Sequence, residues 1–175
     1  MPVPWLVLFL YILALAVWLG EVSFFSFVVA PQVFGNLPVE QAGAVVGLVF
    51  PTYYAIGHLC GAVLLGCALL LRRWSRPAGL LWLVAAGIAG LALVASLYAG
   101  IAVQPRASEL RPQLHHPDTP AAVQSEFDDL HRLAVELNGG ILLAALALAG
   151  LLAAQLAGGV HMRRKPPRRT SDLQW

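Results

Sequence analysis

The chain has 175 residues, of which 59% are hydrophobic and only 11% are charged, and its net charge is +2. A typical soluble chain is about 25% charged, so this composition excludes an ordinary soluble domain. Apolar runs long enough to cross a bilayer fill most of the sequence, and we therefore expect an all-α, integral membrane four-helix bundle. We assign residues 1–160 to this domain and expect residues 161–175 to form a basic, disordered cytoplasmic tail.

The first half of the chain predicts two spans separated by a short surface helix. Span one should run from Pro4 to Ala30, and Pro31 should end it. Residues 39–50 carry apolar side chains at helical spacing but are too few to cross before Pro51, which indicates an interfacial helix lying on the membrane. Span two should then follow from Tyr53 to Leu71.

The second half predicts two further spans and a long polar connection. Span three should run from Pro77 to Val103, beginning with a proline where the first turn of a helix tolerates one. Residues 104–124 are polar and contain four prolines, which is typical of a loop outside the membrane. The fourth helix should begin near Ser125 and cross the membrane between Leu133 and Leu156.

Basic residues indicate how the spans are oriented. They form one cluster at 72–76 and another at 163–169. Because lysine and arginine are enriched in cytoplasmic segments, we expect a multi-pass protein of the bacterial inner membrane with both termini in the cytoplasm. This rule explains the basic tail, so we expect the lipid bilayer and no nucleic acid as partner. The glycine-rich helix faces are compatible with a homo-oligomer.

Polar side chains recur at similar depth in all four spans. At about 1.5 Å per residue from the outer end of its span, Glu21 is about 14 Å deep, His58 and Asn138 about 10 Å, and Tyr98 about 8 Å. His131 shares a helix face with Asn138. Intramembrane polar groups usually face a bundle interior or a wet cavity. We therefore predict an outward-facing polar pocket formed by Glu21, His58, Tyr98, His131 and Asn138.

Three interpretations of this polar layer compete. It could be structural, with buried polar groups that fix helix register. It could handle a small solute, an ion or a proton, with Glu21 as the titrating group. In the third interpretation His58 and His131 bind a cofactor, either haem b or a metal. The sequence shows no nucleophile–base constellation, phosphate loop or paired hydrolytic carboxylates, so we assign no catalytic residue and do not expect an enzyme.

Three separated motifs resemble one known family. They are Trp18-Leu-Gly20 with Phe24 to Pro31, then Ala42-Gly43 with Phe50-Pro51-x-Tyr53-Tyr54, and finally Phe127-x-x-Leu-His131 with Leu137-Asn138. Together they resemble the transmembrane protein 205-like family, a bacterial integral membrane domain of unknown function with eukaryotic relatives. The resemblance implies a four-span helical domain in which His131 and Asn138 are family-type positions, and it implies no activity.

The chain is also distantly similar to copper-resistance protein D and to the HemJ-type protoporphyrinogen oxidases. Both are haem-associated four-helix membrane proteins, so this similarity implies haem binding as an alternative. The haem-site lysine of the HemJ type has no counterpart here, because no lysine lies in any expected span.

Overall fold

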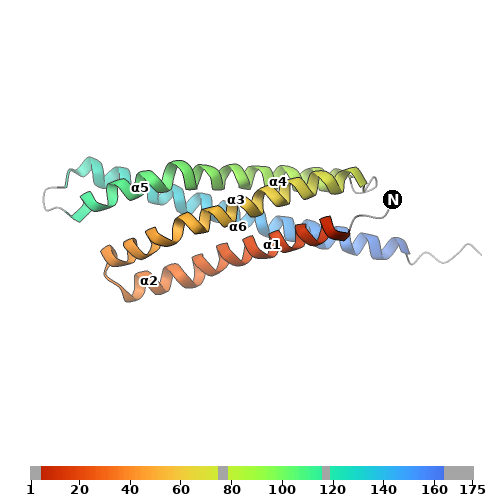
Figure 1. Cartoon of the computed structure of the whole chain (residues 1–175), viewed down its shortest axis with the longest axis horizontal. Coiled ribbons are helices and arrows are strands. Elements are labelled where there is room, and N and C mark those ends of the chain that lie inside the picture. The colour runs from red at the N-terminus through yellow and green to blue at the C-terminus, as the bar shows by residue number, and fades with distance from the viewer. Residues whose placement is uncertain (1–4, 75–78, 116–118, 164–175) are drawn as a thin grey trace, which may run out of the picture.

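The computed structural model describes residues 5–74, 79–115 and 119–163, and this part of the chain folds into four long helices and no strand (Figure 1). Each long helix has the length and apolar composition needed to cross a membrane. Their bounds are Trp5–Asn36, Val39–Trp74, Gly79–Leu114 and Ala121–Ala157. The predicted all-α four-helix bundle is confirmed.

Two of the long helices are interrupted and two are continuous. The first consists of α1 (Trp5–Phe24), the π-helical turn η1 (Phe25–Val29) and α2 (Ala30–Asn36). The third consists of α4 (Gly79–Tyr98), the π-helical turn η3 (Ala99–Val103), α5 (Gln104–Leu110) and the 3₁₀ turn η4 (Arg111–His115). The second is α3 (Val39–Trp74), and the fourth is α6 (Ala121–Arg163).

A proline follows each π-helical turn after one intervening residue. At the end of η1 the N–H of Ala30 bonds to the carbonyl five residues back, and Pro31 follows. At the end of η3 the N–H of Gln104 likewise bonds to the carbonyl of Ala99, five residues back, and Pro105 follows. In an α-helix a proline ring collides with the carbonyl four residues back and leaves it without a donor. The wider π turn relieves this conflict, so each helix continues past its proline.

Several predicted boundaries differ from those of the structure. The first helix extends beyond Pro31, and residues 104–115 are helical where a loop was expected. Residues 39–50 form no separate interfacial helix, because they are the first part of α3, which contains Pro51 in its interior. The predicted tail also begins inside a helix, since α6 continues to Arg163. The remainder of the predicted tail, 164–175, lies outside the described residues.

The bundle packs α3 against α1 and α4, and α6 against the same two helices. The largest fully buried side chain among the described residues is that of Trp18. Its indole packs against α3, because a Cβ added at Gly57 or at Gly61 would lie only 3.1 Å from it. Nearby, Tyr11 and Trp82 join α1 to α4 through an edge-to-face contact with ring centroids 5.3 Å apart. Glycines in α3 thus make room for a large aromatic side chain of α1.

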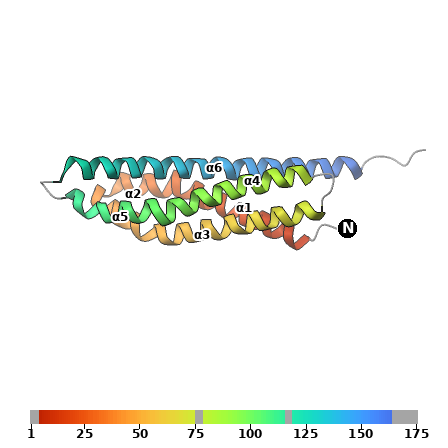
Figure 2. The same ribbon diagram turned by 90° about the horizontal axis from the view of Figure 1, so that it is seen from above.

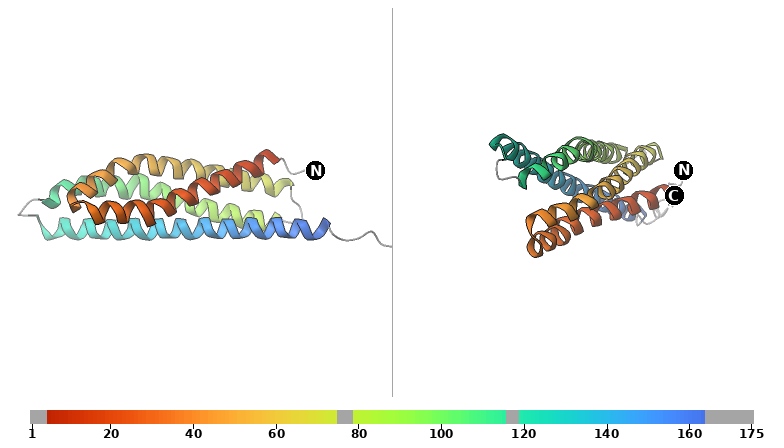
Figure 3. Two further views of the ribbon diagram at one scale, coloured as in Figure 1. Left: turned by 90° about the horizontal axis from the view of Figure 1, so that it is seen from below. Right: turned by 60° about the vertical axis from the view of Figure 1, so that its left-hand side comes forward.

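The two ends of the bundle differ. The N-terminal end of α1 and the C-terminal ends of α3 and α6 lie together at one end (Figures 1 and 2). The opposite end, here called the proline end, holds α2, α5, η4 and the first turns of α3 and α6. There α2 packs on η1 and α3, whereas α5 packs on η3 and α6. The oblique view on the right of Figure 3 shows these two groups of helices diverging.

Candidate functional site

A cavity of about 610 Å³ lies between the two diverging groups at the proline end, and all four long helices line it. We call it the end cavity. Its volume is within the range of about 300–1,000 Å³ that is typical of small-molecule pockets. Most lining residues are apolar, and the polar ones are Ser26, Tyr53, Tyr54, Gln104, Arg111, His131 and Asn138.

Asn138 of α6 connects three helices at the wall of this cavity. The hydroxyl of Tyr53 in α3 donates a hydrogen bond of 2.5 Å to Asn138 Oδ1. Asn138 Nδ2 in turn donates to the hydroxyl oxygen of Ser26 in η1, at 2.9 Å. Buried polar groups in a membrane bundle need such partners because no water is available to replace them. This trio therefore fixes the relative positions of α3, α6 and η1.

Aromatic rings form one apolar wall of the end cavity. Phe25 of η1 lies 5.0 Å from Tyr53 and 5.4 Å from Phe50, measured between ring centroids. Tyr54 lies 5.7 Å from Phe50 and 5.3 Å from Tyr53. Contacts in this range between tilted or edge-on rings are favourable. The π-helical turn η1 thus brings Phe25 into a rigid cluster built mainly by α3.

The two predicted histidines occupy different environments. His131 lines the end cavity, is exposed, and stacks on Phe127 with ring centroids 6.4 Å apart. His58 does not line the cavity, and its Nε2 lies 3.0 Å from the backbone carbonyl oxygen of Ser96 in α4. A carbonyl oxygen accepts from an imidazole N–H, so His58 already has a partner inside the bundle.

Glu21 also lies outside the lining of the end cavity. Both of its carboxyl oxygens are buried, and neither has a hydrogen-bond partner among the residues that the structure describes. A buried polar group without a partner is costly, which makes Glu21 an unusual feature of α1.

The prediction of a single five-residue pocket therefore needs correction. His131 and Asn138 line the end cavity, but Glu21 and His58 do not, and Tyr98 is 51% exposed on the surface of α4. Counting residues along a helix gives the depth of a side chain, because each residue adds the same rise. It does not give the direction in which the side chain points from a helix whose packing partners are unknown.

Arg111 also lines the end cavity, a position that the sequence alone does not predict. It opens η4, and its Nη1 donates a 2.5 Å hydrogen bond to the carbonyl oxygen of Gly43 in α3. A Cβ at Gly43 would lie 3.2 Å from Arg111 Cδ, and one at Gly47 only 2.7 Å from Nη1. Because Gly43 and Gly47 have no side chains, they leave a flat surface on α3, here called the glycine shelf, on which the guanidinium lies. The spacing Gly43-x-x-x-Gly47 indicates a helix face that another segment can approach closely. It does not identify Arg111 as that neighbour, because residues 104–124 were expected to form a loop.

The described side chains do not fit a haem held by both histidines. Only His131 faces the end cavity, and the Nε2 of His58 is occupied by the Ser96 carbonyl. Among the described residues, no group of three or more His, Cys, Asp or Glu side chains could hold a metal ion. The cavity is instead suited to a ligand that combines apolar surface with a few hydrogen-bonding atoms.

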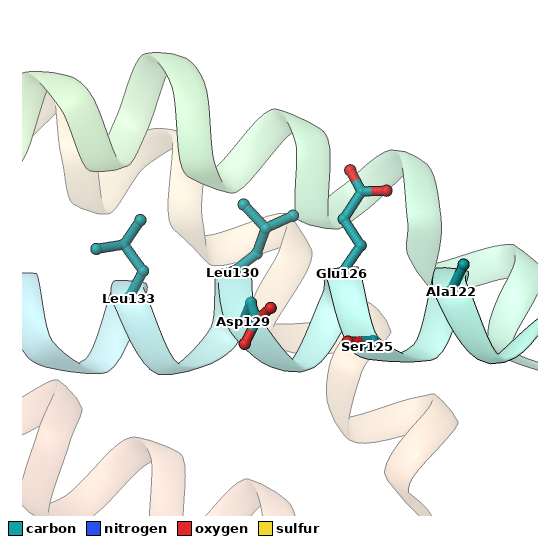
Figure 4. A pocket seen from close by; sticks show the side chains of 6 residues that line it. All are labelled: Ala122, Ser125, Glu126, Asp129, Leu130 and Leu133. Carbon is teal, nitrogen blue, oxygen red and sulfur yellow. The ribbon is translucent and has the colours of Figure 1, made fainter.

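A second hollow of about 460 Å³ lies on the surface at the start of α6 (Figure 4). All six of its lining residues belong to this one helix, and Glu126 points from it toward the neighbouring helix. There Glu126 accepts a hydrogen bond of 2.7 Å from Arg106 Nε of α5. The acidic side chain of this hollow is therefore already used in an ion pair between α5 and α6. Because one helix alone lines the hollow, it does not enclose a ligand.

Comparison with known proteins identifies relatives whose functions are not described. The family model of the domain of unknown function DUF4149 matches residues 13–116, which is more than half of the chain. An uncharacterized protein of Aquifex aeolicus (strain VF5) is 49% identical over 59 residues, which are 34% of this chain and 42% of that protein. The chain thus spans less than half of that relative's length. No solved structure matches the chain.

Proposed function

This chain belongs to the DUF4149 family, a domain of unknown function, and we propose that it is a multi-pass membrane protein whose end cavity binds a small ligand. The observation that supports this function is the cavity itself, with its volume of about 610 Å³. Pockets that combine apolar walls with a few placed polar groups are typical of small-molecule sites. We further propose that the protein uses this cavity to bind or transport a small solute, an ion or a proton.

The placing of the π-helical turns supports a binding role. Three residues of η1 (Phe25, Ser26 and Phe27) line the cavity, and so does Val103 at the end of η3. Such turns cost helix stability and are found frequently at functional sites. Here both turns contribute residues to the same cavity, besides letting their helices continue past Pro31 and Pro105.

The test is a thermal-shift screen of the purified full chain against small amphiphiles and polar solutes. A ligand of the end cavity should raise the melting temperature of the wild type and lose this effect in Ala134→Phe, which fills the cavity from α6. Ala147→Phe is the matched control, because Ala147 is exposed on α6 outside the cavity lining. If every stabilising ligand acts equally on both variants, the end cavity is not the binding site.

The cofactor alternative has its own test. Ligation of haem b or a metal by His58 and His131 requires one site that both side chains reach, and only His131 lines the cavity. A Soret band in the visible spectrum of the purified protein that disappears in His131→Ala would establish this alternative. A colourless protein without bound metal would remove it.

Transport with Glu21 as the titrating group is a further extension. Glu21 lies in α1, four residues before Phe25 of the cavity lining, so a proton held there would lie about one helical turn from the site. Flux into proteoliposomes tests it directly. Transport that is unchanged in Glu21→Gln would exclude Glu21 as the carrier group.

We also propose an inner-membrane location with both termini cytoplasmic. Arg72 and Arg73 occupy the last turn of α3. This turn lies at the end of the bundle where α1 begins and α6 ends (Figure 1). Because basic residues are enriched on the cytoplasmic side of membrane proteins, we place this end in the cytoplasm. The end cavity would then face outward. Reporter fusions to the two chain ends test this orientation. The resemblance to transmembrane protein 205-like proteins, copper-resistance protein D and HemJ-type proteins stays a prediction.

A further inference from the structure

The end cavity contains one cation whose hydrogen-bonding capacity is mostly unused. Arg111 is half-buried, and its guanidinium donates to Gly43 O. Among the described residues no carboxylate forms an ion pair with it, since the ion pairs found there are those of Arg106. A guanidinium has five N–H donors, so most remain available to a ligand. A carboxylate or phosphate group matches this fork of donors.

The cavity is long in the direction of the helices. Its lining on α6 extends from Phe127 to Leu142, and its lining on α3 extends from Val39 to Tyr54. Either range corresponds to about 22 Å at 1.5 Å per residue. Arg111 lies against Gly43, near the outer limit of this length. A cation near one end of a long, mostly apolar slot is complementary to a single hydrocarbon chain with a charged head group.

Farther along the slot, the amide of Asn138 offers little to a polar ligand. Both ends of the Asn138 amide are engaged, by Tyr53 and by Ser26. The rings of Phe25 and Phe50 cover the wall between this trio and the Arg111 end. An apolar chain lying along these rings gains by burial, at about 25 cal/mol per Å² of apolar surface.

The rim of the cavity carries exposed apolar side chains. Phe27, Val39 and Val135 line the cavity and are also 68%, 75% and 58% exposed. All three belong to helices of membrane-spanning length. Exposed apolar side chains at the rim suit entry from the bilayer better than entry of a hydrated anion from water.

We propose that the end cavity binds a single-chain lipid with an anionic head group, and that Arg111 holds that head group. This inference rests on the proposed function, because it assumes that the cavity is a binding site. Fatty-acid carboxylates and lysophospholipid phosphates share the required chemistry, an anionic head on one apolar chain.

Native mass spectrometry of the detergent-purified full chain tests the proposal with four probes: palmitic acid, palmitoyl lysophosphatidic acid, uncharged monopalmitoylglycerol and inorganic phosphate. One copy of an anionic lipid should bind. Arg111→Gln should weaken that binding by about tenfold or more, as expected for loss of a charged hydrogen bond, and leave monopalmitoylglycerol unchanged. Arg111→Lys should retain part of the preference. Arg132→Gln, an exposed position of α6 outside the cavity, is the control.

The possible failures separate the two proposals. Equal binding of charged and uncharged lipids, unaffected by Arg111→Gln but abolished by Ala134→Phe, would overturn the role of Arg111 and leave the cavity as a binding site. Lipid binding that survives Ala134→Phe would overturn the cavity itself. Displacement of palmitic acid by inorganic phosphate alone would show that a free anion, rather than a lipid, is the ligand. Melting temperatures of all variants verify that they fold.

Discussion

The hydroxyl of Tyr53 donates a hydrogen bond to Asn138 Oδ1 across the end cavity, and these two residues are 85 positions apart in the chain. Asn138 Nδ2 also donates a hydrogen bond to the hydroxyl oxygen of Ser26 in η1. Helices α3 and α6 meet there through polar atoms, although each packs mainly against α1 and α4. The bond therefore holds together the two helix groups that diverge at the proline end.

Breaking this bond should destabilise the bundle. We expect Tyr53→Phe and Asn138→Leu each to lower the free energy of unfolding by about 1 kcal/mol, a typical size for a hydrogen bond between membrane helices. The double variant should lose less than the sum, because both changes remove the same bond. Unfolding in detergent measures this cycle, with Tyr98→Phe as control, since Tyr98 is exposed. Fully additive losses would mean that the bond contributes nothing.

The close approach of Trp18 to α3 predicts opposite effects for two glycines of the same helix. A Cβ at Gly57 would lie 3.1 Å from Trp18 Nε1 and 3.2 Å from Ser96 Oγ, whereas one at Gly66 would meet nothing within 4 Å. Gly57→Ala should cost about 1–3 kcal/mol through overpacking. Gly66→Ala should gain up to about 1 kcal/mol from helix propensity. Thermal unfolding of both variants measures the difference, and a stabilised Gly57→Ala would contradict the packing described.

Glu21 should tolerate loss of its charge. Its carboxyl oxygens are buried without a hydrogen-bond partner among the described residues, and an ionised group in such a place is costly. We expect Glu21→Gln to leave the melting temperature unchanged or to raise it. Glu136→Gln, at an exposed position of α6, should have no effect. A melting temperature several degrees lower in Glu21→Gln alone would show that the carboxylate has a stabilising partner.

The contact between Arg111 and the glycine shelf (Gly43 and Gly47) can be tested without changing Arg111. A Cβ at Gly47 would lie 2.7 Å from Nη1, so the side chain of Gly47→Leu should displace the guanidinium. Because this group ends a flexible side chain, we expect the fold to survive and the preference for palmitic acid over monopalmitoylglycerol to fall by about tenfold. Gly66→Leu makes the same change on an open face of α3. A preserved preference in Gly47→Leu would argue against Arg111 as the head-group residue.

The ion pair between α5 and α6 should matter little. Arg106 Nε and Glu126 Oε1 are 2.7 Å apart, but their side chains are 49% and 43% exposed. Exposed pairs contribute about 0–1 kcal/mol and are screened by salt. A double-mutant cycle with Arg106→Gln and Glu126→Gln should give a coupling within that range, smaller at high salt. A larger coupling that is independent of salt would mean that lipid or protein covers this surface.

The sequence by itself determined the number and approximate position of the spans. A helix that crosses a bilayer must satisfy its backbone internally and needs about 20 apolar residues, and both requirements are visible in composition and run length. It also identified His131 and Asn138, which line the end cavity. Prolines were misread as helix ends, because the sequence does not show that a π-helical turn before Pro31 and before Pro105 lets each helix continue.

Only the tertiary structure decided which side chains meet. The depth of a residue follows from its distance along the helix, but the side that it faces depends on the partners of that helix. Glu21, His58 and Tyr98 therefore share a depth with Asn138 without sharing its cavity. Arg111 reaches the cavity because two glycines of α3 leave room for its guanidinium, a complementarity between segments 68 residues apart that neither segment reveals alone.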